Sequence, residues 1–150
     1  MNIFLISLLA SLASLAYGAI LIWLVLKKPA GDEKMREIQR AIQEGASAYL
    51  KRQNRTVFFV GLAAVLILWK WLGLATSIGF VVGAFSSALA GYIGMMVAVR
   101  VNARVAEEAK HGLARAFNLA FKGGAVTGFF VVGLALLSLT LFYWWSGDVK

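Results

Sequence analysis

The side chains that could carry out chemistry are few in this chain: seven carboxylates, one histidine and no cysteine. Metal-assisted hydrolysis needs several carboxylates around one cation and a positioned water. Asp32, Glu33 and Asp148 lie in a connection or at a terminus. Glu107 and Glu108 are adjacent and so point apart on a helix. Glu37 and Glu44 share a helix face, but Glu44 has basic neighbours. We therefore expect no catalytic, cofactor-binding or metal-binding residue here. His111, next to Lys110, is expected to be solvated or interfacial.

Long uncharged tracts between charged clusters indicate a membrane protein. Hydrophobic residues make up 61% of the chain. Residues 1–26, 71–99 and 123–147 contain no charge, and each run exceeds the roughly 20 residues that a helix needs to cross about 30 Å of hydrocarbon. A signal peptide is the alternative for the first run, but that run lacks a basic start and is too long for a signal sequence. We expect a retained transmembrane helix.

A fourth, shorter span lies between Arg55 and Lys70. This stretch covers only roughly 21 Å as a helix, and it can cross the membrane if the flanking cations extend toward water. We predict an all-α integral membrane bundle of four transmembrane helices in a single membrane domain, residues 1–150. The second and third helices are predicted to extend into the cytoplasm, and the predicted bounds are about 2–26, 33–72, 75–121 and 124–145.

Basic residues are concentrated in the two connections that follow the first and third spans. Of the 15 Lys and Arg, all but Lys70 and Lys150 lie there. Cytoplasmic loops carry such an excess, so we predict cytoplasmic connections and extracytoplasmic termini in a multi-pass protein, in a prokaryotic inner membrane. Five cations near the membrane boundary are predicted to contact lipid headgroups or to fix topology: Lys51, Arg52, Arg55, Arg100 and Arg104. Nucleic acid is not an expected partner, because aromatic residues do not interleave with the basic ones.

The segment before the second span has the pattern of an amphipathic helix. Pro29 and Gly31 end the first helix, and Asp32 is a predicted N-cap of the next. Apolar residues then recur at three- and four-residue steps and predict one helix face: Met35, Ile38, Ile42, Ala46 and Tyr49. We expect this face to rest on a similar stripe in residues 101–120, which would form a helical hairpin on the membrane.

Small residues in the third and fourth spans predict close helix packing. Gly79, Gly83, Ser87 and Gly91 are four residues apart, and this spacing lets another helix approach closely in lipid. The motif KGGAV, residues 122–126, is expected to form the turn into the fourth span. Two more glycines are assigned to helix packing, Gly124 and Gly128. The expected partners are membrane lipids and further helices or another membrane subunit, in an oligomer or complex.

Three motifs resemble one known family. The stretches IQEGASAYLKRQ, GYIGMMVAVRVNAR and FKGGAVTG closely resemble the second to fourth transmembrane helices of the membrane-integral pyrophosphatases, the pyrophosphate-energised proton or sodium pumps. The similarity covers roughly residues 33–135, and the first helix fits only by hydropathy and position. The resemblance implies an outer-ring position in a dimeric pump. The family binds Mg²⁺ and pyrophosphate through acidic DxxxD-type signatures and lysines on later helices, so it implies no catalytic residue here.

Three functions are compatible with these observations. The chain could be the N-terminal segment or a split subunit of a pyrophosphate-energised pump, with the catalytic helices elsewhere. It could be a noncatalytic accessory subunit that reuses the same helices in a larger membrane complex. It could also be a small membrane binding module with a basic cytoplasmic hairpin. The first predicts a partner that bears the DxxxD signature, the second unrelated membrane partners, and the third a small oligomer that binds anionic lipid.

Overall fold

Four long helices and short connections make up residues 3–147, which are the residues that the computed structural model describes. The helices are α1 (Ile3–Leu26), α2 (Glu33–Leu72), α3 (Leu74–Ala109) and α4 (Leu113–Ser146). Each of them is long and apolar enough to cross a membrane. The predicted all-α class is therefore confirmed, and so are four helices that are long and apolar enough to be the predicted spans. Asn2, Asp148 and Lys150, which enter the predictions above, lie outside the described residues.

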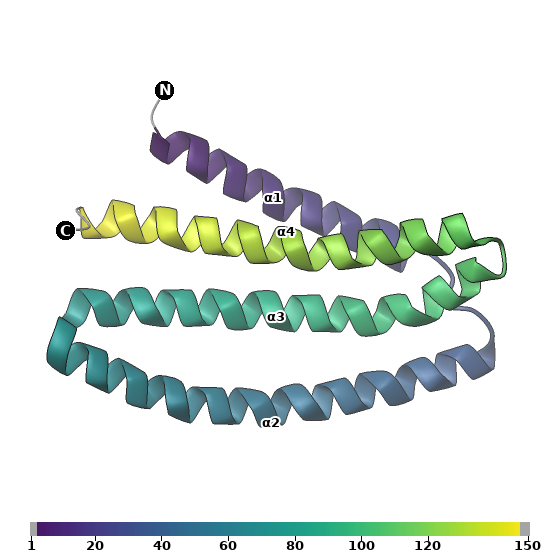
Figure 1. Ribbon diagram of the computed structural model, residues 1–150, viewed down its shortest axis with the longest axis horizontal. Helices are drawn as coiled ribbons and strands as arrows, with labels where there is room; N and C mark the ends of the chain where they lie inside the picture. The colour runs from purple at the N-terminus through teal and green to yellow at the C-terminus, as the bar shows by residue number, and fades with distance from the viewer. Residues whose placement is uncertain (1–2, 148–150) are drawn as a thin grey trace.

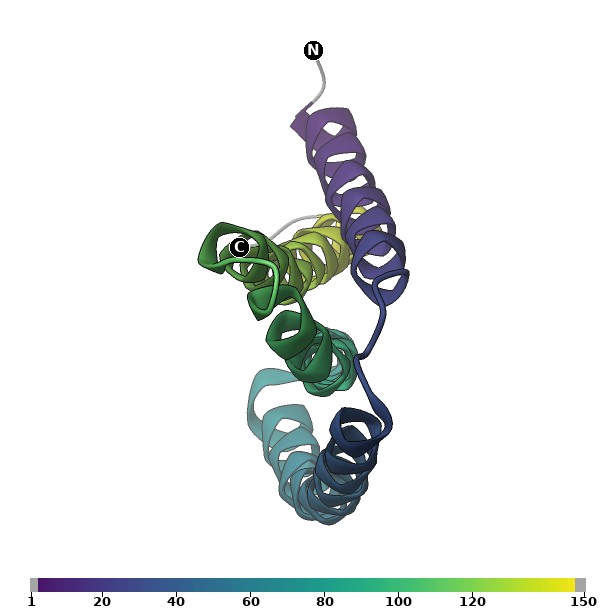
Figure 2. The same ribbon diagram turned by 90° about the vertical axis from the view of Figure 1, so that its right-hand side faces the viewer.

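The helices form an open row rather than a closed bundle. In space their order is α1, α4, α3, α2, and α2 packs on α3 alone (Figure 1). The end-on view shows α1 and α2 at opposite ends of the row (Figure 2). Within residues 3–147, α1 and α2 are not in contact. The predicted four helices are present, and their arrangement in a row was not predicted, because hydropathy identifies candidate spans without identifying their neighbours.

Along the helix axes, the molecule has two ends, and different parts of the chain lie at each. The start of α1, the end of α4 and the α2–α3 turn at Gly73 lie at one end, and the other two connections lie at the opposite end (Figure 1). Gly73 has a φ of 89°, a left-handed conformation that favours glycine. This turn joins two long helices directly, so α2 and α3 run antiparallel. The alternation matches a chain that crosses a membrane four times.

The predicted boundary between the third and fourth helices is wrong. α3 ends at Ala109, so residues 113–121 belong to α4 and do not extend α3. The break lies at Gly112, whose φ is 122°. Gly123 and Gly124, predicted in a turn, lie inside α4. Small residues in a membrane helix let a neighbouring helix approach closely, and the contact with Val101 of α3 explains Gly123 without a turn.

The buried core lies among α1, α3 and α4. Its members are aliphatic residues from these three helices: Leu21, Val25, Val97, Val101, Leu119 and Val126. In contrast, Leu50 is the buried residue of α2. The apolar 18-residue window of α2 that could span the membrane is 0% buried. The row therefore consists of a packed three-helix part and a loosely attached helix.

The apolar stripe on the first half of α2 is rotated relative to the prediction. Ile38, Ile42 and Tyr49 are 54%, 40% and 58% exposed. The less exposed positions of this segment include two glutamines: Met35, Gln39, Gln43, Ala46 and Leu50. α2 does pack on α3, as the predicted hairpin requires, but with a face only partly apolar. A stripe of apolar residues fixes a helix period, and the neighbour decides which side is covered.

Candidate functional site

The connection between α1 and α2 is held by charged side chains at the end of α3. The Lys28 ammonium lies 2.9 Å from a carboxylate oxygen of Glu108. On the next residue, the Glu107 carboxylate lies 2.7 Å from the Lys110 ammonium, which also lies 3.6 Å from Asp32. We call this group, Lys28, Asp32, Glu107, Glu108 and Lys110, the connection cluster. The two adjacent glutamates serve different partners, as expected from side chains that point apart.

Asp32 has a second role at the start of α2. Its carboxylate accepts a hydrogen bond from the backbone N–H of Met35 at 2.9 Å, which confirms the predicted N-cap. That N–H group is the main reason why the pKa of Asp32 lies below its ordinary value, and the Lys110 ammonium adds to the effect. The carboxylate is therefore charged at neutral pH. A charge at this position also matches the positive end of the helix dipole.

The pKa values of Glu108 and Lys110 are both shifted so that the charged form is favoured. The hydrogen bond from Lys28 holds the pKa of the Glu108 carboxyl below its ordinary value. The hydrogen bond to Glu107 raises the pKa of Lys110 above its ordinary value. Both groups are charged at neutral pH, so neither is poised to exchange a proton there. The connection cluster is therefore an ion-pair network that joins helices.

Arg104 caps α1 from a different helix. Its guanidinium donates from Nε to the carbonyl oxygen of Lys28 at 2.9 Å, from Nη2 to that of Leu26 at 3.3 Å, and from Nη1 to that of Arg100 at 2.6 Å. The last carbonyls of a helix have no partner within it, and a cation is favourable at this end. Arg100 donates to the carbonyl oxygen of Met96 at 2.7 Å. Both arginines thus make backbone hydrogen bonds that the sequence did not reveal.

Lys51, Arg52 and Arg55 behave differently from the two arginines of α3. All three are exposed on α2. Among residues 3–147, the ion pairs involve other cations, namely Lys28, Arg40 and Lys110. The five cations predicted at the membrane boundary therefore form two groups, one engaged with backbone and one facing outward. Contact with headgroups stays a prediction for all of them.

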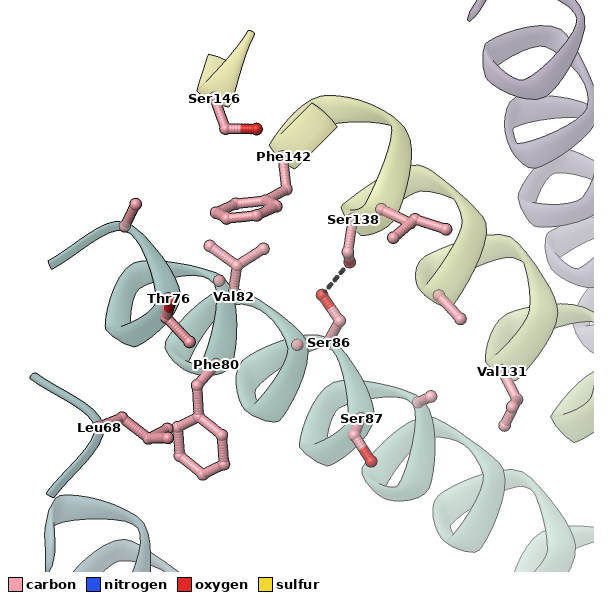
Figure 3. A pocket seen from close by; sticks show the side chains of 16 residues that line it. Leu68, Thr76, Phe80, Val82, Ser86, Ser87, Val131, Ser138, Phe142 and Ser146 are labelled. Atoms are coloured by element: carbon pink, nitrogen blue, oxygen red, sulfur yellow. Dashed lines mark hydrogen bonds between the residues drawn. The ribbon is translucent and has the colours of Figure 1, made fainter. Parts of the chain in front are cut away.

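A cavity of about 890 Å³ opens among α2, α3 and α4, toward the end that holds the α2–α3 turn. Its α3 wall contains Gly79, Gly83 and Ser87, and α2 contributes Leu68. The Ser86 and Ser138 hydroxyls hydrogen-bond across it (Figure 3). The lining residues include no titratable side chain. The cavity is suited to an apolar occupant and lacks the groups for acid–base chemistry.

The predicted packing residues are used unequally within the chain. A Cβ on Gly79 would lie 2.8 Å from the ring of Phe142, so this glycine packs against α4. In contrast, a Cβ would meet nothing within 4 Å at Gly83, Gly91, Gly124 or Gly128. Ser87 is exposed and lines the cavity. For these residues, packing against a further helix stays a prediction.

Other glycines make the close contacts that hold α1, α3 and α4 together. An added Cβ would lie 2.8 Å from Val101 at Gly123, 2.8 Å from Leu15 at Gly133 and 2.9 Å from Phe130 at Gly18. Gly94 meets Thr127 in the same way, at 2.8 Å. No regular four-residue spacing connects these positions, so a spacing argument did not find them.

The described residues offer no group of three or more His, Asp or Glu side chains that could hold a metal ion. Three of the carboxylates already have cationic partners in the connection cluster. The donors that Mg²⁺ prefers in phosphoryl-transfer sites, several carboxylates around one ion, are thus not brought together here. The chemistry of the described part is that of helix packing and charge pairing.

Known proteins similar to this chain belong to the family that its motifs resemble. A model of the family "Inorganic H+ pyrophosphatase" matches residues 12–150. The K(+)-insensitive pyrophosphate-energized proton pump of Methanosarcina mazei is 47% identical over 142 residues, which cover 93% of this chain and 21% of the pump. The K(+)-stimulated pyrophosphate-energized sodium pump of Thermotoga maritima is 37% identical over 147 residues, or 94% of this chain and 20% of the pump. The chain thus spans about a fifth of the length of the curated relatives that it matches.

Proposed function

We propose that this chain, which belongs to the inorganic H+ pyrophosphatase family, supplies N-terminal outer-ring helices of a pyrophosphate-energised ion pump. It acts as a segment or a split subunit, and the residues that bind magnesium pyrophosphate lie on the remaining helices. Coupling of pyrophosphate hydrolysis to H⁺ or Na⁺ transport then requires the assembled pump. This chain contributes framework, and we assign it no catalytic residue.

One observation carries the proposal: the chain aligns over nearly its whole length with one end of a much longer pump, and it leaves α2 uncovered. The match takes in 93% of this chain and 21% of the M. mazei pump. The apolar window of α2 is 0% buried within the chain. Small residues at Gly83, Ser87 and Gly91 leave room beside α3. A helix from the rest of the pump could pack closely on these small residues. Close packing is what stabilises helix association in lipid, where the hydrophobic drive between helices is absent.

The proposed orientation follows from the side chains at the two ends of the molecule along the helix axes. The end with the connection cluster faces the cytoplasm, since basic connections stay on that side. Four of the five tryptophans are exposed in the last turns of α2 and α4, and these two helices end on the opposite side (Figure 1): Trp69, Trp71, Trp144 and Trp145. Such residues favour the membrane–water interface. Both termini are therefore extracytoplasmic in this proposal, in a prokaryotic inner membrane.

The test is reconstitution of a split pump. The remaining part of the M. mazei relative, without its matched region, is expressed with and without this chain. We expect the two to copurify in mild detergent and Mg²⁺-dependent pyrophosphate hydrolysis to appear only when both are present. Gly83→Leu, which fills the open α3 surface, should reduce copurification, whereas Val81→Leu on the same exposed helix serves as a control. Hydrolysis by this chain alone, or by the remainder alone, would contradict the proposal.

The alternative is a noncatalytic accessory subunit of a larger membrane complex. The observation that favours it is the use of Asp32, Glu107 and Glu108 in structural ion pairs. It predicts copurification with membrane proteins that lack the pyrophosphatase signatures, and no effect on hydrolysis in the split-pump experiment. Family membership weighs against a small binding module unrelated to the pump.

A further inference from the structure

We propose that Lys51, Arg52 and Arg55 on α2 form a binding site for anionic phospholipid headgroups of the cytoplasmic leaflet. These three residues are called the α2 triad. The inference does not depend on the pump, but its choice of the cytoplasmic leaflet rests on the orientation proposed above. It also separates these cations from Arg100 and Arg104, whose hydrogen bonds to backbone carbonyls give them a structural role.

The α2 triad forms one patch on the side of α2 that faces away from α3. Residues three and four apart are neighbours on a helix surface, so Arg55 lies beside both Lys51 and Arg52. Leu50 is the buried residue of α2, and the helix packs only on α3. At about 100° per residue, the three cations lie on the opposite half of the helix from Leu50. All three are exposed.

Nothing on the same stretch of helix neutralises this patch. Glu44 is the nearest acidic residue of α2 in sequence, and it lies roughly 10 Å along the helix axis from Lys51. The ion pairs found within residues 3–147 join other cations, and the pair on α2 is between Arg40 and Glu33. Anionic headgroups therefore provide the missing opposite charge, since each nearby Lys or Arg strengthens binding to an anionic leaflet.

The surface that follows the α2 triad selects a lipid rather than a soluble anion. The next turns of the same half of α2 carry large apolar side chains: Phe59, Leu62 and Leu66, exposed by 59%, 48% and 54%. They continue along the helix into the span, where acyl chains would cover them. A patch of cations directly followed by an exposed apolar face matches a phospholipid, with its phosphate at one end and its tails at the other.

The cavity beside α3 does not compete for this assignment. Its α2 wall consists of Leu68, and no member of the α2 triad lines it. Leu68 lies on the same side of α2 as Leu50, since eighteen residues make five turns. A further helix that enters the cavity would thus leave the α2 triad open to lipid. The two faces of α2 are assigned to two different partners, a helix and a phospholipid.

The test measures bound lipid on the full chain. The chain is reconstituted in vesicles of phosphatidylcholine with a minor fraction of phosphatidylglycerol, extracted in mild detergent, and analysed by native mass spectrometry. The triad variant is Lys51→Gln, Arg52→Gln and Arg55→Gln. The matched control is Lys34→Gln, Arg36→Gln and Arg40→Gln, which removes the same charge from the same helix farther from the span. A charge-preserving variant, Lys51→Arg, Arg52→Lys and Arg55→Lys, tests whether a loss reflects charge or folding.

We expect the wild type, the matched control and the charge-preserving variant to retain phosphatidylglycerol in preference to phosphatidylcholine. The triad variant should lose this preference by about fivefold for each cation removed, and on the order of 100-fold in all. Equal preference in the wild type and the triad variant would overturn the proposal. Equal loss in the matched control would overturn it too, because binding would then depend on net charge and not on this patch.

Discussion

α3 has two neighbours, and it packs against them by different means. Against α4 it uses glycines and small residues, so that Val101 lies 2.8 Å from the position of a Cβ on Gly123 and Thr127 lies against Gly94. Against α2 it makes contact without burying the apolar window of that helix at all. A single buried residue, Leu50, and the ion pairs near Asp32 accompany this second contact. α1, α4 and α3 thus form a packed unit, and α2 is attached to its edge.

The α3–α4 and α2–α3 contacts differ in how far they meet the requirements for helix association in lipid. Without a hydrophobic drive between helices in lipid, association depends on close packing and hydrogen bonds. The α1–α4–α3 part meets this need within the chain, and α2 does not. The helix with the least internal packing is also the one with an outward cationic patch and an open α3 surface beside it. We therefore expect mutations in the two parts to differ in how much they destabilise the chain and in how many helices they affect.

The largest effect is expected from Gly123→Leu in the α3–α4 contact. A Cβ there already lies 2.8 Å from Val101, so a leucine must push the helices apart. Overpacking of this kind costs about 1–3 kcal/mol. The thermal unfolding midpoint in detergent should fall clearly. Gly124→Leu is the matched control, because a Cβ at Gly124 meets nothing within 4 Å; an equal fall in both variants would contradict the described packing.

A second effect of comparable size is expected from Arg104→Gln. The change removes charged donors from the backbone carbonyls of Leu26, Lys28 and Arg100. Hydrogen bonds to charged groups contribute about 1.5–3 kcal/mol. The free energy of unfolding in mixed micelles should fall by an amount in this range. Arg104→Lys should not restore it, since an ammonium lacks the planar fork.

Arg100→Gln is the control for this prediction. Arg100 donates to Met96 within its own helix, so its loss removes no link between helices. We expect a smaller decrease in the free energy of unfolding than for Arg104→Gln. If the two decreases were equal, the cap that α3 provides for α1 would have no special importance.

The smallest and most local effect is expected from Asp32→Ala at the start of α2. Loss of the N-cap should speed amide exchange at Met35 roughly fivefold, with no change in α1, α3 or α4. The pKa of Asp32 is lowered in the folded chain by the Met35 N–H. The carboxylate cap is therefore fully present above the ordinary pKa of an aspartate, about 3.9, and is lost as the pH falls through the lowered value.

A pH titration of the Met35 amide chemical shift measures this loss. The wild type should show a transition below about pH 4, with the cap intact above it. Asp32→Asn provides the control, because asparagine is an equally good N-cap with no charge to titrate. Its Met35 amide should show no such transition. A transition of the same size in the asparagine variant would assign the effect to another group.

The sequence by itself determined the helices and much of their chemistry. Uncharged runs are a local property, so three of the four predicted spans and the all-α class could be read directly, whereas the fourth required its flanking cations to extend toward water. Asp32 could be identified as a cap because a cap involves only residues a few positions apart. The pyrophosphatase motifs could be recognised from residue order alone. The break at Gly112 was missed because an apolar pattern continued across it, and the glycines at 123 and 124 were a stronger turn signal.

Only the tertiary structure decided which residues meet. It set the order α1, α4, α3, α2 and selected Gly123 over Gly124 as a close contact. It also brought Arg104 to the end of α1, which is 78 residues away in sequence at Leu26. The physical reason is rotation: each residue turns a helix by about 100°, so adjacent residues face different neighbours. Helix formation is local, whereas the face that a helix buries depends on partners distant along the chain.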